Sequence, residues 1–234
     1  MQAIGAISFD VTGTLLGLPR LGEIYAEAFR RHGHEADAAA MGRVVPAVWQ
    51  EMSIRTRLGE DRFAAHLEGA KGFWRELVAR VAAHLELPAP TPFLAAELYD
   101  RFAHAEAWEV FADARTLLPR LRDAGVRLAV ASNFDGRLPR LLEESGLAAH
   151  LETIVYSEEV GVEKPHPALF EEVLARLGLP ATDVVHVGDS RRDDVEGARA
   201  IGMQALWLTR DSTRGDLRTL AELPDWLRSG SSSD

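Results

Sequence analysis

The chain has 234 residues, 47% of them hydrophobic, and a formal net charge of −10. This length suffices for one full core or for a core domain with a smaller insert. The acidic balance argues against nucleic acid or an anionic membrane as the main partner. Cysteine is absent, which excludes a disulfide framework, a thiolate metal site and a cysteine nucleophile. The N-terminus has no basic region, and no stretch reaches the roughly 18 apolar residues of a transmembrane helix. We therefore expect a soluble cytoplasmic protein.

Short apolar runs predict the buried strands of a parallel sheet. Four of them end in polar, turn-forming residues, and a fifth, Thr153–Tyr156, is a weaker signal. Each has four to eight residues and is rich in Val, Ile or Leu, as buried parallel strands are. The other four runs are Ala3–Phe9, Arg127–Ala131, Val184–Val187 and Gln204–Leu208.

Amphipathic segments between most of these runs predict helices that end at glycine. Glycine is the expected stop because it adopts positive φ without a Cβ clash. The alternation of strand and helix predicts an α/β fold, a Rossmann-like parallel sheet with helices on both faces. The predicted helices are Thr116–Ala124, Leu138–Ser145, Pro167–Leu177 and Val195–Ile201.

The region from about residue 17 to residue 106 carries helical patterns and no strand-like run. We interpret it as an all-helical domain, residues 17–106, inserted after the first strand. Residues 1–16 and 107–228 then form the core domain, and the polar tail 229–234 is expected to be disordered. The predicted helices of the insert are Leu21–Arg31, Arg43–Thr56, Phe63–Glu68, Phe73–Glu86 and Phe93–Phe102.

Polar residues follow the predicted strands, at the sheet edge where open parallel sheets bind ligands. Carboxylates that converge there would repel one another unless a cation lay between them. Oxygen ligands without cysteine suggest Mg²⁺ as that cation. The residues are Asp10, Thr12, Gly13 and Thr14 after the first run, Ser132 and Asn133 after the second, Lys164 in GVEKPHP, and Asp189, Ser190, Asp193 and Asp194 after VVHV.

The same set of residues suits phosphate chemistry. A hydroxyl, an ammonium group and exposed backbone N–H groups can hold a phosphate, and an aspartate can attack phosphorus. Each residue also has a simpler interpretation. Asp10 could be a turn residue, Ser132 a helix cap and Lys164 a surface lysine, while Asp193 fits best as an acid at a helix start.

Four segments, FDVTGT, ASN, EKPHPALF and VGDSRRDDVEGARAIGM, resemble the four motifs of the haloacid dehalogenase (HAD) superfamily. The helical insert resembles the cap domain of its subfamily I. The resemblance implies that Asp10 is the nucleophile and a metal ligand, and that Ser132 binds the phosphate. It also implies that Lys164 pairs with both the phosphate and the nucleophile. We expect Gly13, Thr14 and Asn133 on the substrate-binding side.

The resemblance also implies a Mg²⁺ site. Asp10 and Asp189 would bind the ion directly, the backbone carbonyl of Thr12 would be another ligand, and Asp194 would support the metal or its waters. The implied reaction is hydrolysis of a small phosphorylated metabolite through an aspartyl-phosphate. Neither nucleic acid nor a membrane is expected as a partner, and the sequence leaves the oligomeric state open.

Thr12 departs from the pattern of the family's phosphatases, which carry an aspartate two residues after the nucleophile. That aspartate protonates the leaving oxygen and later activates water, whereas a threonine hydroxyl is far too weak an acid. General acid–base catalysis typically contributes ~10²–10⁴-fold. P-type ATPases also have threonine here but carry separate nucleotide and dephosphorylation domains. The family's dehalogenases have an aromatic residue here and lack the acidic last motif.

Three functions follow from these observations. A Mg²⁺-dependent phosphatase accounts for most of the motifs, and we prefer it. A phospho-ligand-binding or regulatory protein would explain the missing acid, and a 2-haloacid dehalogenase would use Asp10 to attack carbon. His166 is a candidate replacement base, although a turn residue is the better interpretation. Arg191 and Arg192 are expected to be solvated. Candidate substrate contacts in the insert are Arg20, Arg43, Arg55 and Arg57.

Overall fold

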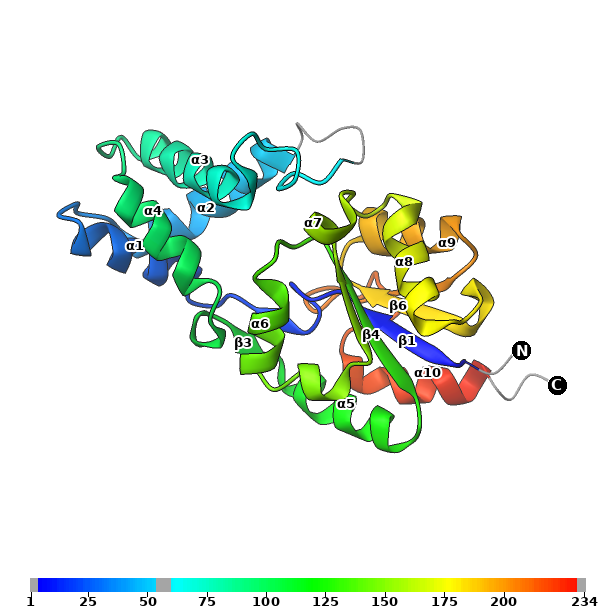
Figure 1. Ribbon diagram of the computed structural model, residues 1–234. Coiled ribbons are helices and arrows are strands. Elements are labelled where there is room, and N and C mark those ends of the chain that lie inside the picture. The colour runs from blue at the N-terminus through cyan, green and yellow to red at the C-terminus, as the bar shows by residue number, and fades with distance from the viewer. Residues whose placement is uncertain (1–3, 54–59, 231–234) are drawn as a thin grey trace. The chain divides into compact units, whose positions relative to one another are not determined.

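A computed structural model describes residues 4–53 and 60–230 of the protein (Figure 1). The chain consists of two compact units. The first comprises Met1–Gly17 and Val110–Asp234, and the second comprises Leu18–Glu109. Arg55 and Arg57, two of the candidate substrate contacts, lie outside the described residues. Among the residues that are described, no helix has both the length and the apolar character needed to cross a bilayer.

The first unit is built on a five-stranded sheet with the order β5-β4-β1-β6-β7. Every neighbouring pair of strands is parallel. Because β1 lies at the centre, a residue that follows β1 has the carboxyl ends of β4 and β6 on either side of it, where open parallel sheets bind ligands. All five predicted strands are present, and the predicted α/β fold is confirmed. The strands are β1 Ala6–Phe9, β4 Arg127–Ser132, β5 Thr153–Tyr156, β6 Val184–Gly188 and β7 Gln204–Trp207.

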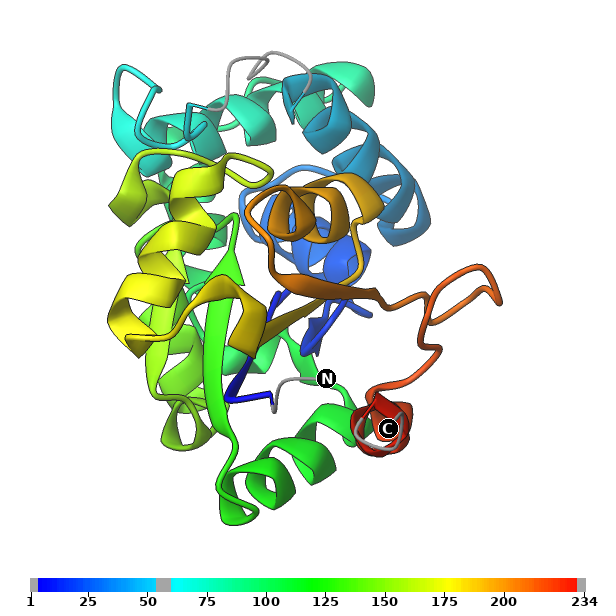
Figure 2. The same ribbon diagram turned by 90° about the vertical axis from the view of Figure 1, so that its right-hand side faces the viewer.

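Helices cover both faces of this sheet. Helices α8 and α9 lie on one face, and α5 and α10 lie on the other (Figures 1 and 2). On the α8 face, Ala6 of β1 and Val184 of β6 share a buried apolar cluster with Phe170 of α8. The helices are α5 Ala112–Asp123, α6 Leu138–Glu144, α7 Ser157–Val160, α8 Pro167–Leu177, α9 Gly197–Ala200 and α10 Leu223–Gly230, with short 3-10 turns at Ala148–His150, Ala181–Asp183 and Leu220–Glu222.

The helix predicted over Val195–Ile201 begins earlier and has a different form. Residues Arg191–Glu196 form a π-helix that continues into α9. The Ser190 hydroxyl accepts a hydrogen bond from the Asp193 amide, and the Ser190 carbonyl accepts one from the Asp194 amide at 2.9 Å. A π-helix contains more residues per turn than an α-helix and is frequent at functional sites.

The second unit is helical, and its described residues form four α-helices around a core that includes Tyr25, Phe29 and Phe73. The helix predicted over Phe63–Glu68 is wrong, because these residues form turns. The Asp61 carboxylate accepts hydrogen bonds from the amides of Phe63 and Ala64, which caps the first turn. The helices are α1 Leu21–Arg31, α2 Ala38–Ser53, α3 Gly69–His84 and α4 Pro92–Arg101, followed by a 3-10 turn at Ala105–Ala107.

The chain passes between the two units through two short paired strands, β2 (Leu16–Gly17) and β3 (Glu109–Val110). Within the first unit, the Phe111 amide donates to the Leu15 carbonyl at 3.1 Å. At the other end of the chain, α10 includes residues 229 and 230 of the expected tail. Residues 231–234 lie outside those described.

Candidate active site

Asp10 follows β1 directly and opens a tight loop, residues 10–15, which we call the β1 loop. The Asp10 amide still donates to the β6 carbonyl of Val187, at 3.0 Å, so the sheet fixes the start of the loop. The Val11 carbonyl then accepts the amides of Leu15 and Leu16 at 2.8 and 2.9 Å. Gly13 has φ +84°, a left-handed conformation that favours glycine. The loop therefore holds Asp10 at the carboxyl edge of the central strand.

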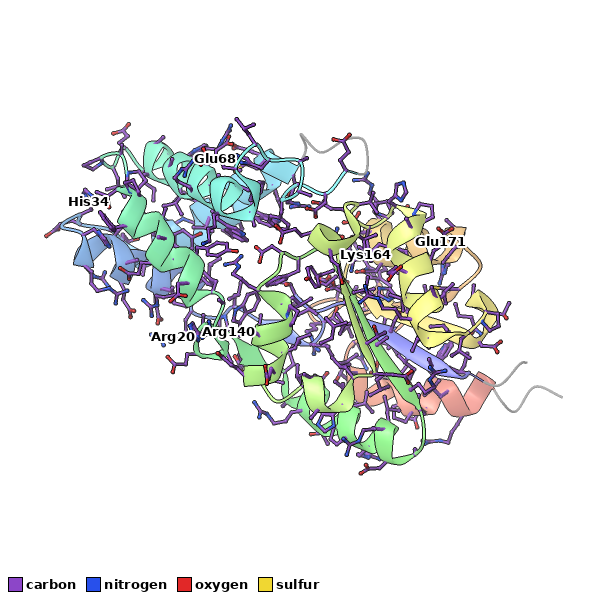
Figure 3. The ribbon with its side chains drawn as sticks, in the orientation of Figure 1. Arg20, His34, Glu68, Arg140, Lys164 and Glu171 are labelled. Atoms are coloured by element: carbon purple, nitrogen blue, oxygen red, sulfur yellow. The ribbon has the colours of Figure 1, made fainter. Side chains whose placement is uncertain are left out.

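Lys164 is the hub of the polar contacts at this edge. Its ammonium group donates to Asp10 Oδ1 at 2.7 Å, to Asp194 Oδ1 at 2.6 Å and to the Ala131 carbonyl at 2.8 Å. These three acceptors use all three donors of an ammonium group. The residue is buried, and Figure 3 labels it between the end of β4 and α8. The arrangement places one cation between two carboxylates.

Ser132 and Asn133, at the end of β4, act on this group in different ways. The Ser132 hydroxyl donates to Asp10 Oδ1 at 3.1 Å. The Asn133 side chain instead binds the backbone of Lys164, since its Nδ2 donates to the Lys164 carbonyl and its Oδ1 accepts from the Lys164 amide. Asn133 therefore anchors the segment that presents the lysine.

Asp194 reaches the site from the π-helix and is held by three donors. Its Oδ1 accepts from Lys164 and lies 3.1 Å from His186 Nε2, and its Oδ2 accepts from the Ser190 amide at 2.8 Å. On the far side of the imidazole, His186 Nδ1 lies 2.7 Å from Ser8 Oγ. A continuous hydrogen-bonded chain thus runs from the interior of the sheet to the Asp10 carboxylate.

The oxygen atoms of three carboxylates converge at this edge. Asp10, Asp189 and Asp194 each offer a ligand atom, and these atoms lie within 4.8 Å of one another. Two glycines make room for them. A Cβ on Gly13 would lie 2.2 Å from Asp189 Oδ2, and one on Gly188 would lie 2.1 Å from Asp194 Cγ. An all-oxygen donor set of this size fits a hard divalent cation such as Mg²⁺.

The electrostatics of the group also favour a cation. Burial works against the Lys164 ammonium, but the charges of Asp10 and Asp194 outweigh it and raise the pKa of Lys164. Burial raises the pKa of Asp10, while Lys164 opposes that rise. Asp189 is exposed to solvent, yet desolvation by the surrounding protein and the charges of Asp10 and Asp194 raise its pKa to about 7. One ammonium group does not neutralise three carboxylates, so the cluster has an excess of negative charge.

Other residues singled out in the sequence take more modest positions. Thr12 is exposed to solvent. The Thr14 hydroxyl is sealed from solvent and has no hydrogen-bond partner among residues 4–53 and 60–230. His166 caps α8, its Nδ1 accepting the Ala168 amide, and the exposed Arg191 pairs with Glu196 at 3.5 Å.

Four residues that support the site were not identified from the sequence. Ser8 and His186 are polar residues within buried apolar runs, and they are direct partners in the β1–β6 register. Trp207 Nε1 donates to the Asp189 carbonyl at 2.9 Å, and Arg210 Nε donates to the Gly13 carbonyl at 3.1 Å. Ser8 and His186 could have been found from the sequence, because each is a polar residue inside an apolar run. No sequence pattern pointed to Trp207 or Arg210.

The comparisons with known proteins identify the family of the chain. A family model of haloacid dehalogenase-like hydrolases matches residues 4–202. Haloacid dehalogenase-like hydrolase domain-containing protein 3 of Danio rerio is 33% identical over 233 residues, which covers 95% of this chain and 96% of that protein. Phosphoserine phosphatase of Thermus thermophilus is 36% identical over 141 residues, 59% of this chain and 56% of that one.

A solved structure, a HAD phosphatase from Thermococcus onnurineus, superimposes with a TM-score of 0.65 at 26% identity. It covers 95% of this chain and 97% of its own. The match to the family model and the full-length relative together show the family. The chain belongs to the haloacid dehalogenase-like hydrolases.

Proposed function

We propose that this hydrolase is a Mg²⁺-dependent phosphatase that acts on a small phosphorylated metabolite through a phosphoryl group carried on Asp10. The observation that carries the proposal is the environment of Asp10 Oδ1, which lies 3.1 Å from Ser132 Oγ and 2.7 Å from Lys164 Nζ beside two further carboxylates. A nucleophile, two donors and a set of cation ligands share one sheet edge. The similarity to a phosphoserine phosphatase and a HAD phosphatase supports the same reaction class.

The proposed reaction proceeds in two displacements at phosphorus. A carboxylate oxygen of Asp10 attacks, the new O–P bond forms, and the leaving oxygen departs with its electron pair. Water then attacks the same phosphorus atom, releases inorganic phosphate and restores the Asp10 carboxylate. As the new bond forms, the hydrogen bonds that Ser132 and Lys164 donate to the Asp10 carboxylate would shift to the phosphoryl oxygens, where negative charge has to be stabilised.

Asp10 and Asp189 are the side chains that would hold the cation, with the backbone carbonyl of Thr12 as a further ligand and Asp194 in support. When bound, the cation would offset charge on the transferring phosphoryl group. Asp194 has a second task in the protein itself, because it accepts a hydrogen bond from Lys164 and so directs that ammonium group toward Asp10.

Thr12 sets the substrate preference within this proposal. The side-chain hydrogen bonds to Asp10 come from Ser132 and Lys164, and neither is suited to protonate an alkoxide leaving group. Substrates whose leaving group is already a weak base need no such proton. We therefore expect aryl and acyl phosphates to be hydrolysed faster than alkyl phosphates.

The test is a screen of phosphorylated metabolites and p-nitrophenyl phosphate with wild type and Asp10→Asn, each with Mg²⁺ and with EDTA. Phosphate release that needs both Asp10 and Mg²⁺ is the expected result. Asp10→Asn keeps the size of the side chain, and its melting temperature shows whether the fold is retained. Release that is unchanged in folded Asp10→Asn would overturn the proposal.

Two other outcomes identify the alternative functions. The missing acid at Thr12 is the observation behind a phospho-ligand-binding protein, which would bind phosphate or a phosphorylated ligand tightly without hydrolysing a phosphate ester over hours. A dehalogenase would release halide from 2-haloacids in EDTA. The convergence of Asp189 and Asp194 on Asp10 argues against dehalogenation, which needs no cation site.

A further inference from the structure

The loop between β7 and α10, residues 208–219, lies beyond the residues that match the family model. It is the orange-red loop that leaves β7 and leads to α10 in Figure 2. The loop folds back on its own strand, since the Leu217 amide donates to the Trp207 carbonyl and the Thr209 amide donates to the Leu217 carbonyl. These backbone hydrogen bonds fix the part of the loop that carries Arg210.

Arg210 contacts the β1 loop at Gly13, from which it is separated by 197 positions in the sequence. Its Nε donates to the Gly13 carbonyl at 3.1 Å, and its Nη2 donates to the Thr14 carbonyl at 2.7 Å. These two carbonyls belong to the second half of the β1 loop, which we call the Gly13–Thr14 limb. A Cβ on Gly13 would meet Asp189 Oδ2 at 2.2 Å, so the residue whose carbonyl Arg210 binds lies directly against a carboxylate of the cation cluster.

The other side of the guanidinium binds the start of α5. Arg210 Nη1 lies 2.9 Å from Asp113 Oδ2, and Nη2 lies 3.2 Å from Asp113 Oδ1. The guanidinium carbon stands 3.8 Å from the centre of the Phe111 ring. That ring in turn packs on Gly17, where a Cβ would lie 2.9 Å from it. The chain leaves the first unit after Gly17 and returns to it at Val110. Arg210 therefore packs directly on Phe111 at the return and, through that ring, on Gly17 at the exit.

Asp113 is itself fixed by other parts of the loop. Its Oδ2 also accepts the Thr219 hydroxyl at 2.6 Å and the Leu220 amide at 2.8 Å. Burial opposes the ionised form, but these bonds and Arg210 lower the pKa of Asp113. A charged, planar fork that satisfies a carboxylate and two carbonyls together cannot be replaced by the point charge of lysine.

The geometry points to Arg210 as a positioning residue of the active site, which rests on the function proposed above. Arg210 fixes the Gly13–Thr14 limb of the β1 loop, and through it the spacing between the Asp10 and Asp189 carboxylates. Its hydrogen bonds go to backbone carbonyls of the β1 loop and to the Asp113 carboxylate, and not to the Asp10 or Asp189 side chains. Misplacement of reacting groups by about 1 Å can cost on the order of 100-fold in rate, so we expect the loss of Arg210 to lower kcat by about 10- to 100-fold with little change in KM.

The test compares Arg210→Ala, Arg210→Lys and the control Arg214→Ala, which removes an exposed arginine of the same loop. Three properties are measured: kcat and KM on p-nitrophenyl phosphate, Mg²⁺ affinity by calorimetry without substrate, and amide hydrogen exchange of residues 12–16 without Mg²⁺. We expect both Arg210 variants to lose kcat and Mg²⁺ affinity and to exchange faster. Arg214→Ala should match wild type in all three.

Guanidinium chloride, added far below the concentrations that unfold proteins, provides the decisive rescue. It should restore part of the lost kcat and Mg²⁺ affinity in Arg210→Ala and do nothing for Arg210→Lys, where the ammonium group occupies the space. Wild-type kcat and Mg²⁺ affinity in folded Arg210→Ala would overturn the inference. If wild type hydrolyses no phosphate ester, the proposed phosphatase fails, but Mg²⁺ affinity and hydrogen exchange still decide the role of Arg210.

Discussion

Ser8 and His186 face each other across two central strands, with Ser8 Oγ 2.7 Å from His186 Nδ1. Both side chains are completely buried. The opposite ring nitrogen of His186 lies 3.1 Å from Asp194 Oδ1. The Ser8–His186 pair therefore holds a carboxylate of the candidate site from within the sheet. An imidazole with its proton on Nε2 satisfies this chain, since Nε2 then donates to Asp194 and Nδ1 accepts the serine hydroxyl.

Ser8→Ala is predicted to destabilise the protein by about 1–3 kcal/mol, because it leaves a buried imidazole nitrogen without its partner. Urea unfolding in EDTA measures this. Ser145→Ala is the matched control, since Ser145 donates one hydrogen bond to Leu142 on a partly buried surface, and its loss should be smaller. We also expect Ser8→Ala, and not Ser145→Ala, to weaken Mg²⁺ binding. Equal stabilities and equal affinities in the two variants would contradict the role of the pair.

The sequence allowed the residues that follow the strands to be singled out, but not the residues that hold those side chains in place. Buried strands and glycine stops follow from local periodicity, so β1 and α8 could be placed to within a few residues. Ser8 was visible as a polar residue in an apolar run, but its pairing with His186 depends on the register of two strands far apart in sequence. The π-helix that presents Asp194 and the reach of Arg210 to Gly13 depend on tertiary contacts that no local pattern encodes.

Gly13→Ala is predicted to displace Asp189 and to weaken Mg²⁺ binding. The new Cβ would lie 2.2 Å from Asp189 Oδ2 at a residue with φ +84°. Gly125→Ala provides the control, because Gly125 has φ +83° and the added Cβ would have no atom of the described residues within 4 Å. Both variants should lose about 1–2 kcal/mol from the left-handed backbone, measured by urea unfolding. Calorimetry should show that Gly13→Ala alone loses Mg²⁺ affinity, and comparable affinities would refute the assignment.

Lys164→Met is predicted to abolish turnover and to destabilise the metal-free protein. Asp10 and Asp194 would keep their buried positions but lose the ammonium group between them, and removing one partner of a buried ion pair costs about 3–5 kcal/mol. Added Mg²⁺ should recover part of that loss. Lys71→Met removes the other lysine of the chain, an exposed residue, and should stay within about 0.5 kcal/mol of wild type. Unfolding curves with EDTA and with Mg²⁺ test both statements.

The stability of the metal-free protein is predicted to fall as the pH rises toward 7. The pKa of Asp189 is about 7 in the folded protein against 3.8 ordinarily, so the folded state binds this proton more tightly than the unfolded state. The resulting stabilisation is complete below about pH 4 and is lost as the pH passes through about 7. Melting temperatures in EDTA between these limits should decline less in Asp189→Asn than in wild type. Parallel pH profiles of the two proteins would count against the shift.

Thr12→Asp is predicted to raise turnover on alkyl phosphates, by up to the ~10²–10⁴-fold that general acid–base catalysis contributes. The new carboxyl group could protonate an alkoxide as it leaves and then accept a proton from the attacking water. Thr12 is exposed, so the change creates no cavity. Thr12→Asn has the same size without the acid and serves as the control. On p-nitrophenyl phosphate, whose leaving group needs no proton, the two variants should differ little. If Thr12→Asp hydrolyses alkyl phosphates no faster than Thr12→Asn, the missing acid at residue 12 does not limit this enzyme.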